Sequence, residues 1–170
     1  MTARVPSQRP PSLAGADWLI RPETQAVFAA LAAAGHAARA VGGAVRNSLI
    51  GRPASDVDIA TTATPDEVMA AAAAAGLHAV PTGIAHGTVT VVSGHEPFEV
   101  TTLREDVESF GRHARVAFTA DWVSDAHRRD FTMNALYCDA AGGVLDPVGG
   151  YPDLLAGEVR FIGDPTARIG

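Results

Sequence analysis

The sequence predicts an α/β fold of the α+β type, in which helices and strands alternate within one domain. Three observations support this class. Apolar residues recur at helical spacing over residues 23–34, and residues 64–67 form a capping-box sequence that opens a second helix. Two alternating stretches, 88–92 and 98–103, flank a short turn and are expected to pair as antiparallel strands. A chain of 170 residues is long enough to bury a sizeable core as one domain.

Each element of the first half has a local cause. Over residues 23–34, Val27, Phe28 and Leu31 fall on one helical face, and Gly35 is placed to end the helix. The other elements expected in this half are a strand at 40–41, a helix over 44–50, a strand over 57–60 and a helix over 65–75 that stops at Gly76.

The second half of the chain has weaker patterns. Residues 104–119 are polar and contain Gly111, so they are expected to form a long connection that is disordered until substrate binds. A helix expected over residues 124–136 would place Asp130 and Asn134 on one face, four residues apart. The remaining expected elements are strands at 136–139, 144–145 and 159–162, and a short helix over 151–155.

The N-terminal residues 1–22 begin polar and proline-rich, so they are expected to form a loose leader before a domain over 23–170. No stretch reaches the roughly 18 uninterrupted apolar residues of a membrane span, and no signal-peptide pattern is present. Cys138 is the single cysteine, which excludes an internal disulfide framework and a cysteine-cluster zinc site. These features predict a cytoplasmic protein with no membrane partner.

The charged residues exclude several functions. All 13 basic residues are arginine, so the chain lacks the phosphate lysine of a Walker A loop and any lysine nucleophile. The formal net charge of −6 is opposite to the basic excess of a domain that grips nucleic acid by itself. We therefore expect weak RNA binding through this chain alone. A nucleotide site remains compatible, because a few arginines and a bound metal dominate its local field.

The most informative motif is Gly42-Gly43-Ala44-Val45-Arg46. Gly42 and Gly43 let a backbone approach phosphate oxygens, and N–H groups at the start of the following helix carry partial positive charge. Arg46 can form two hydrogen bonds to a phosphate. After nine intervening residues come Asp56 and Asp58. A glycine pair is common in tight turns and an aspartate pair at solvated strand ends, but their combination in this order predicts a nucleoside triphosphate site.

Asp56 and Asp58 are candidate Mg²⁺ ligands. On a strand their side chains leave one face, with about 7 Å between Cα atoms. Mg²⁺ takes one or two carboxylates and completes its shell with water and phosphate. Two such ions about 4 Å apart would activate an attacking hydroxyl and stabilise departing pyrophosphate. Glu99, which faces away from Phe98 and Val100, is a candidate third acid or a solvated glutamate.

Arg129 is a further candidate, because on a helix over 124–136 it could project toward the triphosphate. The alternative is a solubilising arginine on an exposed face.

In this order the motifs resemble the class II tRNA nucleotidyltransferases, a family that includes CCA-adding enzymes and bacterial poly(A) polymerases. The resemblance runs from about Arg39 to the C-terminus. The matching stretches are 41–46 (VGGAVR), 56–61 (DVDIAT), 86–89 (HGTV), 98–104 (FEVTTLR), 128–135 (RRDFTMNA), 146–147 (DP) and 149–150 (GG).

The resemblance implies the head domain of the polymerase-β-like superfamily, with a mixed, mainly antiparallel sheet flanked by helices. It implies that Gly43 and Arg46 contact the triphosphate, that the aspartate pair binds Mg²⁺, that Arg129 contacts the nucleotide, and that Asp130 and Asn134 brace the sugar. The implied reaction is attack of an RNA 3′ hydroxyl on the α-phosphate of CTP or ATP, with release of pyrophosphate. CCA addition to the tRNA 3′ end is the expected activity, with poly(A) synthesis as the alternative.

The sequence departs from the family pattern at two places. Asn47 replaces an aspartate that usually follows the arginine, which keeps a hydrogen-bonding group. In the family, a Glu-Asp-x-x-Arg type motif and helical neck, body and tail regions follow the arginine that Arg168 matches, and these are absent here. We therefore expect an isolated head, half of a split enzyme that needs a C-terminal partner chain or a homo-oligomer, or a truncated product. A non-catalytic nucleotide-binding or assembly module and a transferase for a non-RNA acceptor are the competing hypotheses.

Overall fold

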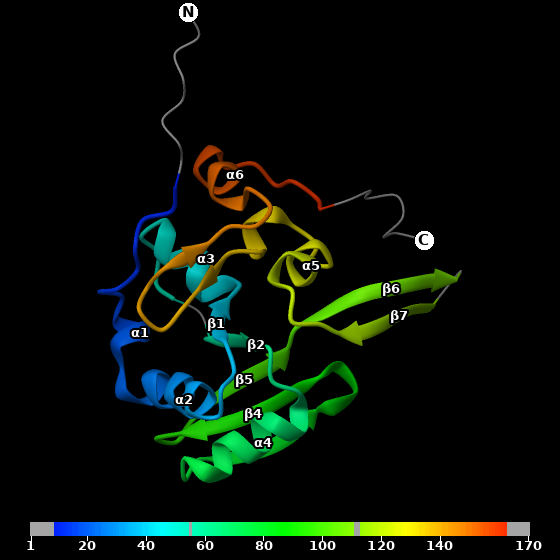
Figure 1. Ribbon diagram of the computed structural model, residues 1–170. Coiled ribbons are helices and arrows are strands. Elements are labelled where there is room, and N and C mark those ends of the chain that lie inside the picture. Colours follow the sequence, from blue (N-terminus) through cyan, green and yellow to red (C-terminus); the bar gives the residue numbers. More distant parts are fainter. Residues whose placement is uncertain (1–8, 55, 111–112, 163–170) are drawn as a thin grey trace, which may run out of the picture.

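The computed structural model describes residues 9–54, 56–110 and 113–162. Within these residues one seven-stranded sheet forms the centre of the molecule (Figure 1). All of its neighbouring strands are antiparallel except for β2 and β5, which confirms the predicted mixed, mainly antiparallel sheet. In spatial order the strands are β3 (His78–Gly83), β4 (Thr88–Ser93), β5 (Glu96–Thr102), β2 (Asp58–Thr61), β1 (Ala38–Val41), β8 (Tyr137–Cys138) and β9 (Val144–Leu145).

Helices pack on both faces of the sheet, and strand alternation decides which side chains they meet. On one face α2 (Pro22–Ala33) and α4 (Pro65–Ala74) share a core with the buried Ile59. On the other face α5 (Trp122–His127) shares a smaller core with Ala60. No helix of the described residues has the length and apolar character of a bilayer-spanning segment. The shorter helical segments are α1 (Asp17–Ile20), α3 (Gly43–Leu49), α6 (Gly150–Ala156) and the 3₁₀ turns η1 (Ile84–His86) and η2 (Thr132–Asn134).

The strongest local signals predicted their elements correctly. The capping box is present, because Thr64 Oγ1 accepts a hydrogen bond from Glu67 N at 3.4 Å and Glu67 Oε1 accepts one from Thr64 N at 2.9 Å. β4 and β5 form the predicted antiparallel pair, with Ser93 opposite Glu96 at the turn. Helix α2 and the strands β1 and β2 lie within two residues of their predicted bounds.

The N-terminal segment packs against the domain, which corrects the prediction of a loose leader over residues 1–22. Trp18 and Leu19 of α1 are buried, and Trp18 Nε1 donates a hydrogen bond to Ser48 Oγ at 2.6 Å. The sequence pattern did not indicate this segment because α1 has four residues, which is too short to show a helical period. Residues 1–8 of the predicted leader lie outside the described residues.

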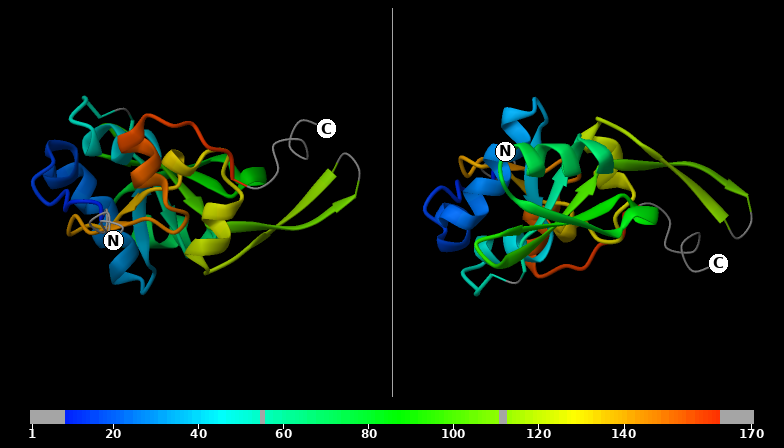
Figure 2. Two further views of the ribbon diagram at one scale, coloured as in Figure 1. Left: turned by 90° about the horizontal axis from the view of Figure 1, so that it is seen from above. Right: turned by 90° about the horizontal axis from the view of Figure 1, so that it is seen from below.

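Residues 104–110 and 113–118 form two paired strands, which corrects the prediction that residues 104–119 are a disordered connection. β6 (Arg104–Phe110) and β7 (His113–Phe118) pair antiparallel as a separate two-stranded sheet. Both views of Figure 2 show this hairpin extending away from the rest of the domain. A ribbon of this kind pairs its own backbone groups without packing a face on the sheet core, so its sequence needs no strict apolar alternation.

The helix predicted over residues 124–136 is wrong beyond its first turns. α5 ends at residue 127, and Phe131 has extended backbone angles of φ −119° and ψ 146° before η2 begins. The Asp130 carboxylate accepts a hydrogen bond from Phe131 N at 2.8 Å. Short polar side chains that bond to nearby backbone groups compete with helix formation, so Asp130 stabilises the break.

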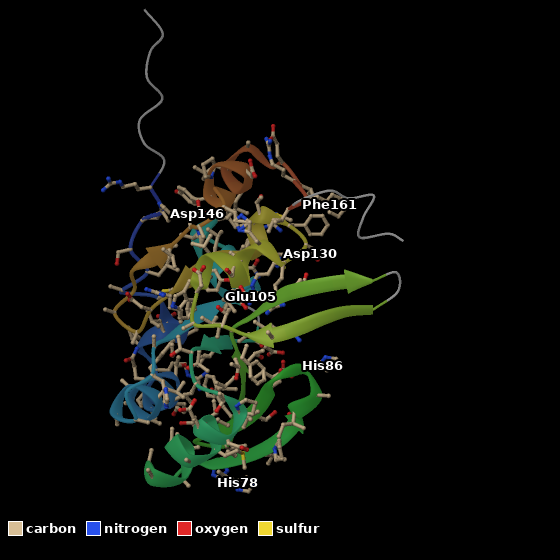
Figure 3. The ribbon with its side chains drawn as sticks, turned by 45° about the vertical axis from the view of Figure 1, so that its right-hand side comes forward. His78, His86, Glu105, Asp130, Asp146 and Phe161 are labelled. Carbon is tan, nitrogen blue, oxygen red and sulfur yellow. The ribbon has the colours of Figure 1, made fainter. Side chains whose placement is uncertain are left out.

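The C-terminal segment explains the same break from the other side. The strand predicted over residues 159–162 is reduced to a single bridge between Phe161 and Phe131, and Ile162 N donates to Asp130 O at 2.9 Å. Figure 3 labels Asp130 and Phe161, which lie near each other where the chain returns. The preceding elements agree with prediction, since β8, β9 and α6 lie at the expected places.

We predict that Leu19→Ala lowers the free energy of unfolding by about 2–5 kcal/mol, because Leu19 is 1% exposed and its removal leaves a cavity. Ile20→Ala, one position along α1, is the control. Ile20 is 56% exposed, so its loss should cost less than about 0.5 kcal/mol. Urea unfolding followed by circular dichroism measures both values, and equal small losses would mean that the segment is loose after all.

Candidate active site

Three acidic side chains lie near the beginning of β2, where the register of the sheet brings distant parts of the chain together. Asp58 is the first residue of β2, opposite Val41 of β1 on one side and Glu99 of β5 on the other. Paired residues project from the same face of a sheet, with strands about 5 Å apart. Asp58 and Glu99 are therefore neighbours, and the exposed Asp56 lies two residues before Asp58, just outside β2.

The electrostatics of this group indicate that it suits a cation. Partial burial raises the pKa of Asp58, and the negative charges of Glu99 and Asp56 raise it further, while Arg129 opposes the shift. The ionised form of Asp58 is thus disfavoured by its neighbours, and a bound divalent cation would remove that cost.

Carboxylate oxygens are the hard ligands that Mg²⁺ prefers, so the residues present fit this ion. In residues 9–54, 56–110 and 113–162, no three His, Cys, Asp or Glu side chains gather closely enough to form a metal centre alone. A site built here would draw one or two ligands from the protein and the rest from water and phosphate, which is the usual arrangement for Mg²⁺.

The predicted glycine pair adjoins the carboxylates. Gly42 has a φ of +84°, which side-chain-bearing residues rarely adopt, and α3 begins at the next residue, Gly43. Because Val41 is opposite Asp58, the backbone of Gly42 and Gly43 emerges from β1 directly beside the aspartate. The fold therefore brings the predicted phosphate-binding loop and the predicted metal ligands to the same end of adjacent strands.

Three of the predicted nucleotide-binding residues form one hydrogen-bonded chain. Arg46 Nη1 on α3 donates to Asn134 Oδ1 at 2.8 Å, and Asn134 Nδ2 donates to Asp130 Oδ1 at 3.4 Å. Arg46 Nε also donates to Asn47 Oδ1 at 3.2 Å. Asn47 thus holds the guanidinium through its amide oxygen. Asn134 and Asp130 meet across the helix break rather than on a continuous helix, which corrects the predicted basis for their proximity.

Arg129 is held by a buried carboxylate that the sequence analysis did not single out. Asp125 is 0% exposed, and its Oδ2 accepts hydrogen bonds from Arg129 Nη2 at 3.1 Å and from Tyr137 Oη at 2.6 Å. Its Oδ1 accepts from Arg128 Nε at 3.0 Å and from Arg104 N at 3.1 Å. This network fixes the direction of the Arg129 side chain.

The network also connects to the carboxylates through the sheet. Tyr137 of β8 is opposite Val41, which is opposite Asp58, so Glu99, Asp58, Val41 and Tyr137 form one row on a single face. Arg129 Nε donates to Tyr137 Oη at 3.2 Å and its charge lowers the pKa of Asp58. The structure therefore brings Arg129 within electrostatic range of the predicted metal ligands.

Burial alone would raise the pKa of Asp125, but the Arg129 and Arg128 guanidinium groups and the Tyr137 hydroxyl hold it below its ordinary value. The pKa of Tyr137 is shifted in the opposite direction, because burial raises the pKa of its phenol. Asp125 is consequently ionised and Tyr137 is neutral at pH 7.

A cleft of about 610 Å³ opens beside the carboxylates. It lies where β2 starts. Residues 54, 56 and 57 line one side and the first half of β5 another, and α1, α2 and the residue between them also contribute to its lining. Its lining residues are Trp18, Arg21, Thr24, Ala54, Asp56, Val57, Asp58, Thr90, Glu96, Pro97, Phe98 and Glu99.

The structure thus places the predicted site residues in four groups, which are the three carboxylates, the glycine loop beside them, the hydrogen-bonded chain of Arg46, Asn134 and Asp130, and Arg129 within electrostatic range of Asp58. Sequence reasoning missed Asp125 and Tyr137, although Asp125 stands four residues before Arg129, the spacing of a helical ion pair. It also missed the cleft residues Trp18 and Arg21, because they lie in the segment that was assigned to the leader.

Comparisons with known proteins give one consistent result. The Poly A polymerase head domain family matches residues 38–160. Mitochondrial CCA tRNA nucleotidyltransferase 1 of Danio rerio is 48% identical over 132 residues, which cover 77% of this chain and 31% of that protein. The CCA-adding enzyme of Anoxybacillus flavithermus is 44% identical over 137 residues, which cover 79% of this chain and 34% of that protein.

Solved structures agree with the sequence matches. The Bacillus stearothermophilus CCA-adding enzyme in complex with CTP has a TM-score of 0.77 and 38% identity, over 88% of this chain and 36% of that one. A tRNA nucleotidyltransferase complexed with a primer tRNA and an incoming ATP analog has a TM-score of 0.63 and 27% identity, over 81% of this chain and 39% of that one. The chain therefore spans about a third of the length of the proteins it matches.

We predict that Asp125→Asn lowers the free energy of unfolding at pH 7 by about 3–5 kcal/mol, because it leaves two guanidinium groups without their buried counter-charge. Tyr137→Phe, which removes one hydroxyl, should cost about 1–3 kcal/mol. Urea unfolding of the two variants and the unchanged protein measures these differences.

The cost of Asp125→Asn should depend on pH. The pKa of Asp125 is lowered in the folded protein, so its ionisation stabilises the fold above the unfolded pKa of about 4 and this contribution is lost as pH falls through the lower folded pKa. The stability gap between variant and unchanged protein should therefore narrow below about pH 4. A gap that stays constant at acidic pH would contradict the assigned charge state.

Proposed function

Since the chain belongs to the Poly A polymerase head domain family, we propose that it carries the nucleotidyl-transfer site of a CCA-adding enzyme. In this reaction the 3′ hydroxyl of an RNA attacks the α-phosphate of CTP or ATP and pyrophosphate leaves. One observation carries the proposal: Asp58 at the start of β2 lies between Glu99 of β5 and the end of β1, from which the Gly42–Gly43 backbone continues. This displacement requires a phosphate-binding loop next to paired carboxylates.

The relatives support the choice of substrate. The proteins that match this chain include enzymes named for CCA addition, one of them solved with CTP. A tRNA nucleotidyltransferase solved with a primer tRNA and an ATP analog matches as well. We extend these substrates to the chain as part of the proposal. The tRNA 3′ end, the nucleotide and a C-terminal partner region or second copy that grips tRNA are its proposed partners.

In the proposed complex the triphosphate lies over the start of α3. The backbone N–H groups of Gly42 and Gly43 point toward its phosphates, and Arg46 and Arg129 neutralise its charge. Arg46 is oriented by Asn134 and Arg129 by Asp125 before the nucleotide arrives. This preorganisation reduces the free energy needed to align the charges during the reaction.

Asp130 and Asn134 are proposed to contact the sugar of the nucleotide. Asp130 is exposed, and its carboxylate already accepts hydrogen bonds from Asn134 Nδ2 and Phe131 N. Both of these bonds go to Oδ1, so the other carboxylate oxygen, Oδ2, can accept a hydrogen bond from a ribose hydroxyl.

Asp56 and Asp58 are proposed to hold Mg²⁺, and Glu99 beside Asp58 is proposed to act as the general base. When bound, the ion supplies a Lewis acid for the attacking and leaving oxygens. The chain's own carboxylates orient the acceptor hydroxyl and take up its proton through Glu99, which is exposed and adjacent to Asp58.

Poly(A) synthesis is the second candidate, because the matching family is described by poly A polymerase. The two activities differ in the nucleotides incorporated rather than in the chemistry of transfer. A cytoplasmic location remains part of the proposal, while the Danio rerio relative is mitochondrial by name.

We predict that the chain incorporates labelled CTP and ATP into a tRNA transcript that ends before its CCA. Asp58→Asn should reduce the rate by at least about 10³-fold, since a bound metal supplies several kcal/mol of transition-state stabilisation. Asp66→Asn is the matched control, because it makes the same chemical change at an exposed residue in the first turn of α4, away from the site. Incorporation is read on denaturing gels.

The product pattern separates the hypotheses. Addition of C, C and A supports the main proposal, and a run of A alone supports poly(A) synthesis. Mg²⁺-dependent CTP binding without turnover, measured by calorimetry, supports a non-catalytic module, and label on a non-RNA acceptor supports the third hypothesis. Equal activity of Asp58→Asn and Asp66→Asn would overturn the assigned role of Asp58.

A further inference from the structure

We propose that Arg21 binds the backbone phosphate of the acceptor strand and that Glu96 competes with that phosphate for the Arg21 guanidinium. The inference rests on the proposed function. It assigns a role to the N-terminal segment, which lies outside residues 38–160 that match the family.

The first step is the order of groups across the sheet. The Gly42 loop and then Tyr137, which contacts Arg129, lie on one side of Asp58, over β1 and β8. Glu99 and then Thr90 lie on the other side, over β5 and β4. The cations proposed for the triphosphate and the 610 Å³ cleft therefore occupy opposite sides of the same aspartate.

The second step is the geometry of the reaction. In phosphoryl and nucleotidyl transfer, the attacking and leaving oxygens lie roughly in line on opposite sides of the phosphorus. If pyrophosphate leaves toward Arg46 and Arg129, the attacking hydroxyl comes from the Glu99 side. The cleft beside Glu99 is where the end of the acceptor strand then lies.

The third step is the distribution of charge along the cleft. Asp56, Asp58 and Glu99 line the cleft where β2 starts, while Arg21 pairs with Glu96, which is three residues before Glu99 at the start of β5. Among the described residues that line the cleft, Arg21 is the one cation. The last nucleoside of an acceptor presents a neutral sugar to the metal-binding acids, and its phosphodiester follows further out, where a guanidinium can form two hydrogen bonds to it.

The fourth step is the availability of Arg21. Its side chain is 47% exposed and is paired with Glu96, and more loosely with Glu23 at 3.5 Å from Nε to Oε2. Exposed ion pairs contribute little free energy, so a phosphate can displace Glu96 at small cost. Glu96 also adds negative charge at the place where the phosphate binds, so it should weaken acceptor binding.

The test uses the full chain with Mg²⁺, CTP and a tRNA transcript that ends before its CCA. Arg21→Ala should raise the KM for the transcript about 10-fold or more and leave the KM for CTP unchanged, because one charged hydrogen-bonding contact to the acceptor is lost. The slope of log KM against log salt should fall by about 1. Arg9→Ala, which removes an exposed cation that does not line the cleft, should change neither value.

Glu96→Gln distinguishes this role from a structural one. It keeps the shape of the side chain, frees Arg21 and removes a negative charge, so it should lower the KM for the transcript. The decrease should be smaller in an Arg21→Ala background, where only the negative charge of Glu96 is removed. A purely structural ion pair would make Arg21→Ala and Glu96→Gln change KM in the same direction, which would overturn the proposal. Equal KM values for Arg21→Ala and Arg9→Ala would overturn it as well.

A binding measurement keeps this test separate from that of the proposed function. Fluorescence anisotropy of the 3′-labelled transcript with Mg²⁺ and without nucleotide reports acceptor binding when no turnover occurs. Weaker binding by Arg21→Ala and tighter binding by Glu96→Gln support the proposal even if incorporation fails. Binding that is the same for all variants, or absent for the unchanged chain, refutes it.

Discussion

The site depends on the register of β2 between β1 and β5. A slip of one residue in a strand turns each side chain to the opposite face, so the register decides whether Asp58 meets Glu99 and the glycine loop. Ile59 and Ala60 are both buried, on opposite faces, which pins the strand from two sides. Asp58 is exposed because it stands at the end of this buried strand. The same apolar residues that stabilise the sheet therefore set the position of the carboxylate.

A second constraint is the charge balance behind the site. The chain has a formal net charge of −6, yet the guanidinium groups of Arg128 and Arg129 both pair with the buried carboxylate of Asp125, and the Arg104 guanidinium lies within electrostatic range of it. Burial lowers the pKa of Arg104, and its neighbours Arg128 and Arg129 lower it further. Arg104 Nε is buried without a hydrogen-bond partner among the described residues. Local positive charge is thus held in place beside acids that would otherwise repel a nucleotide.

The parts of the fold that could be predicted from sequence are those with a local cause. The capping box at Thr64 fixed a helix start, and the alternation in β4 and β5 fixed a hairpin, because each signal is contained within a few residues. The glycine pair and the aspartate pair identified two sides of the site for the same reason. That they share one site was predicted from their combination and order along the chain, whereas the strand register that brings them together is a property of the whole sheet.

The parts that could not be predicted depend on distant contacts. The break after residue 127 is stabilised by pairing of Phe131 with Phe161, which lies 30 residues further along the chain. A helical period over 124–136 carries no information about that partner. The β6–β7 hairpin extends away from the main sheet (Figure 2). The polar sequence of residues 104–119 therefore suggested a loop rather than strands.

The N-terminal helices α1 and α2 are hydrogen-bonded to α3 and to Ala140, so parts of the chain that are distant in sequence pack as one unit. Trp18 is bonded to Ser48 of α3, the helix that carries Arg46, and Ser48 Oγ donates to Ala44 O at 2.8 Å. Gln25 Nε2 of α2 donates to Leu19 O at 2.8 Å and Ala140 O at 3.0 Å. Arg21 lies between α1 and α2, so its backbone is held at both sides relative to α3. A cleft whose two ends are held by one packed unit keeps a constant separation between the cation and the carboxylates, and positioning of this kind is what an in-line displacement requires.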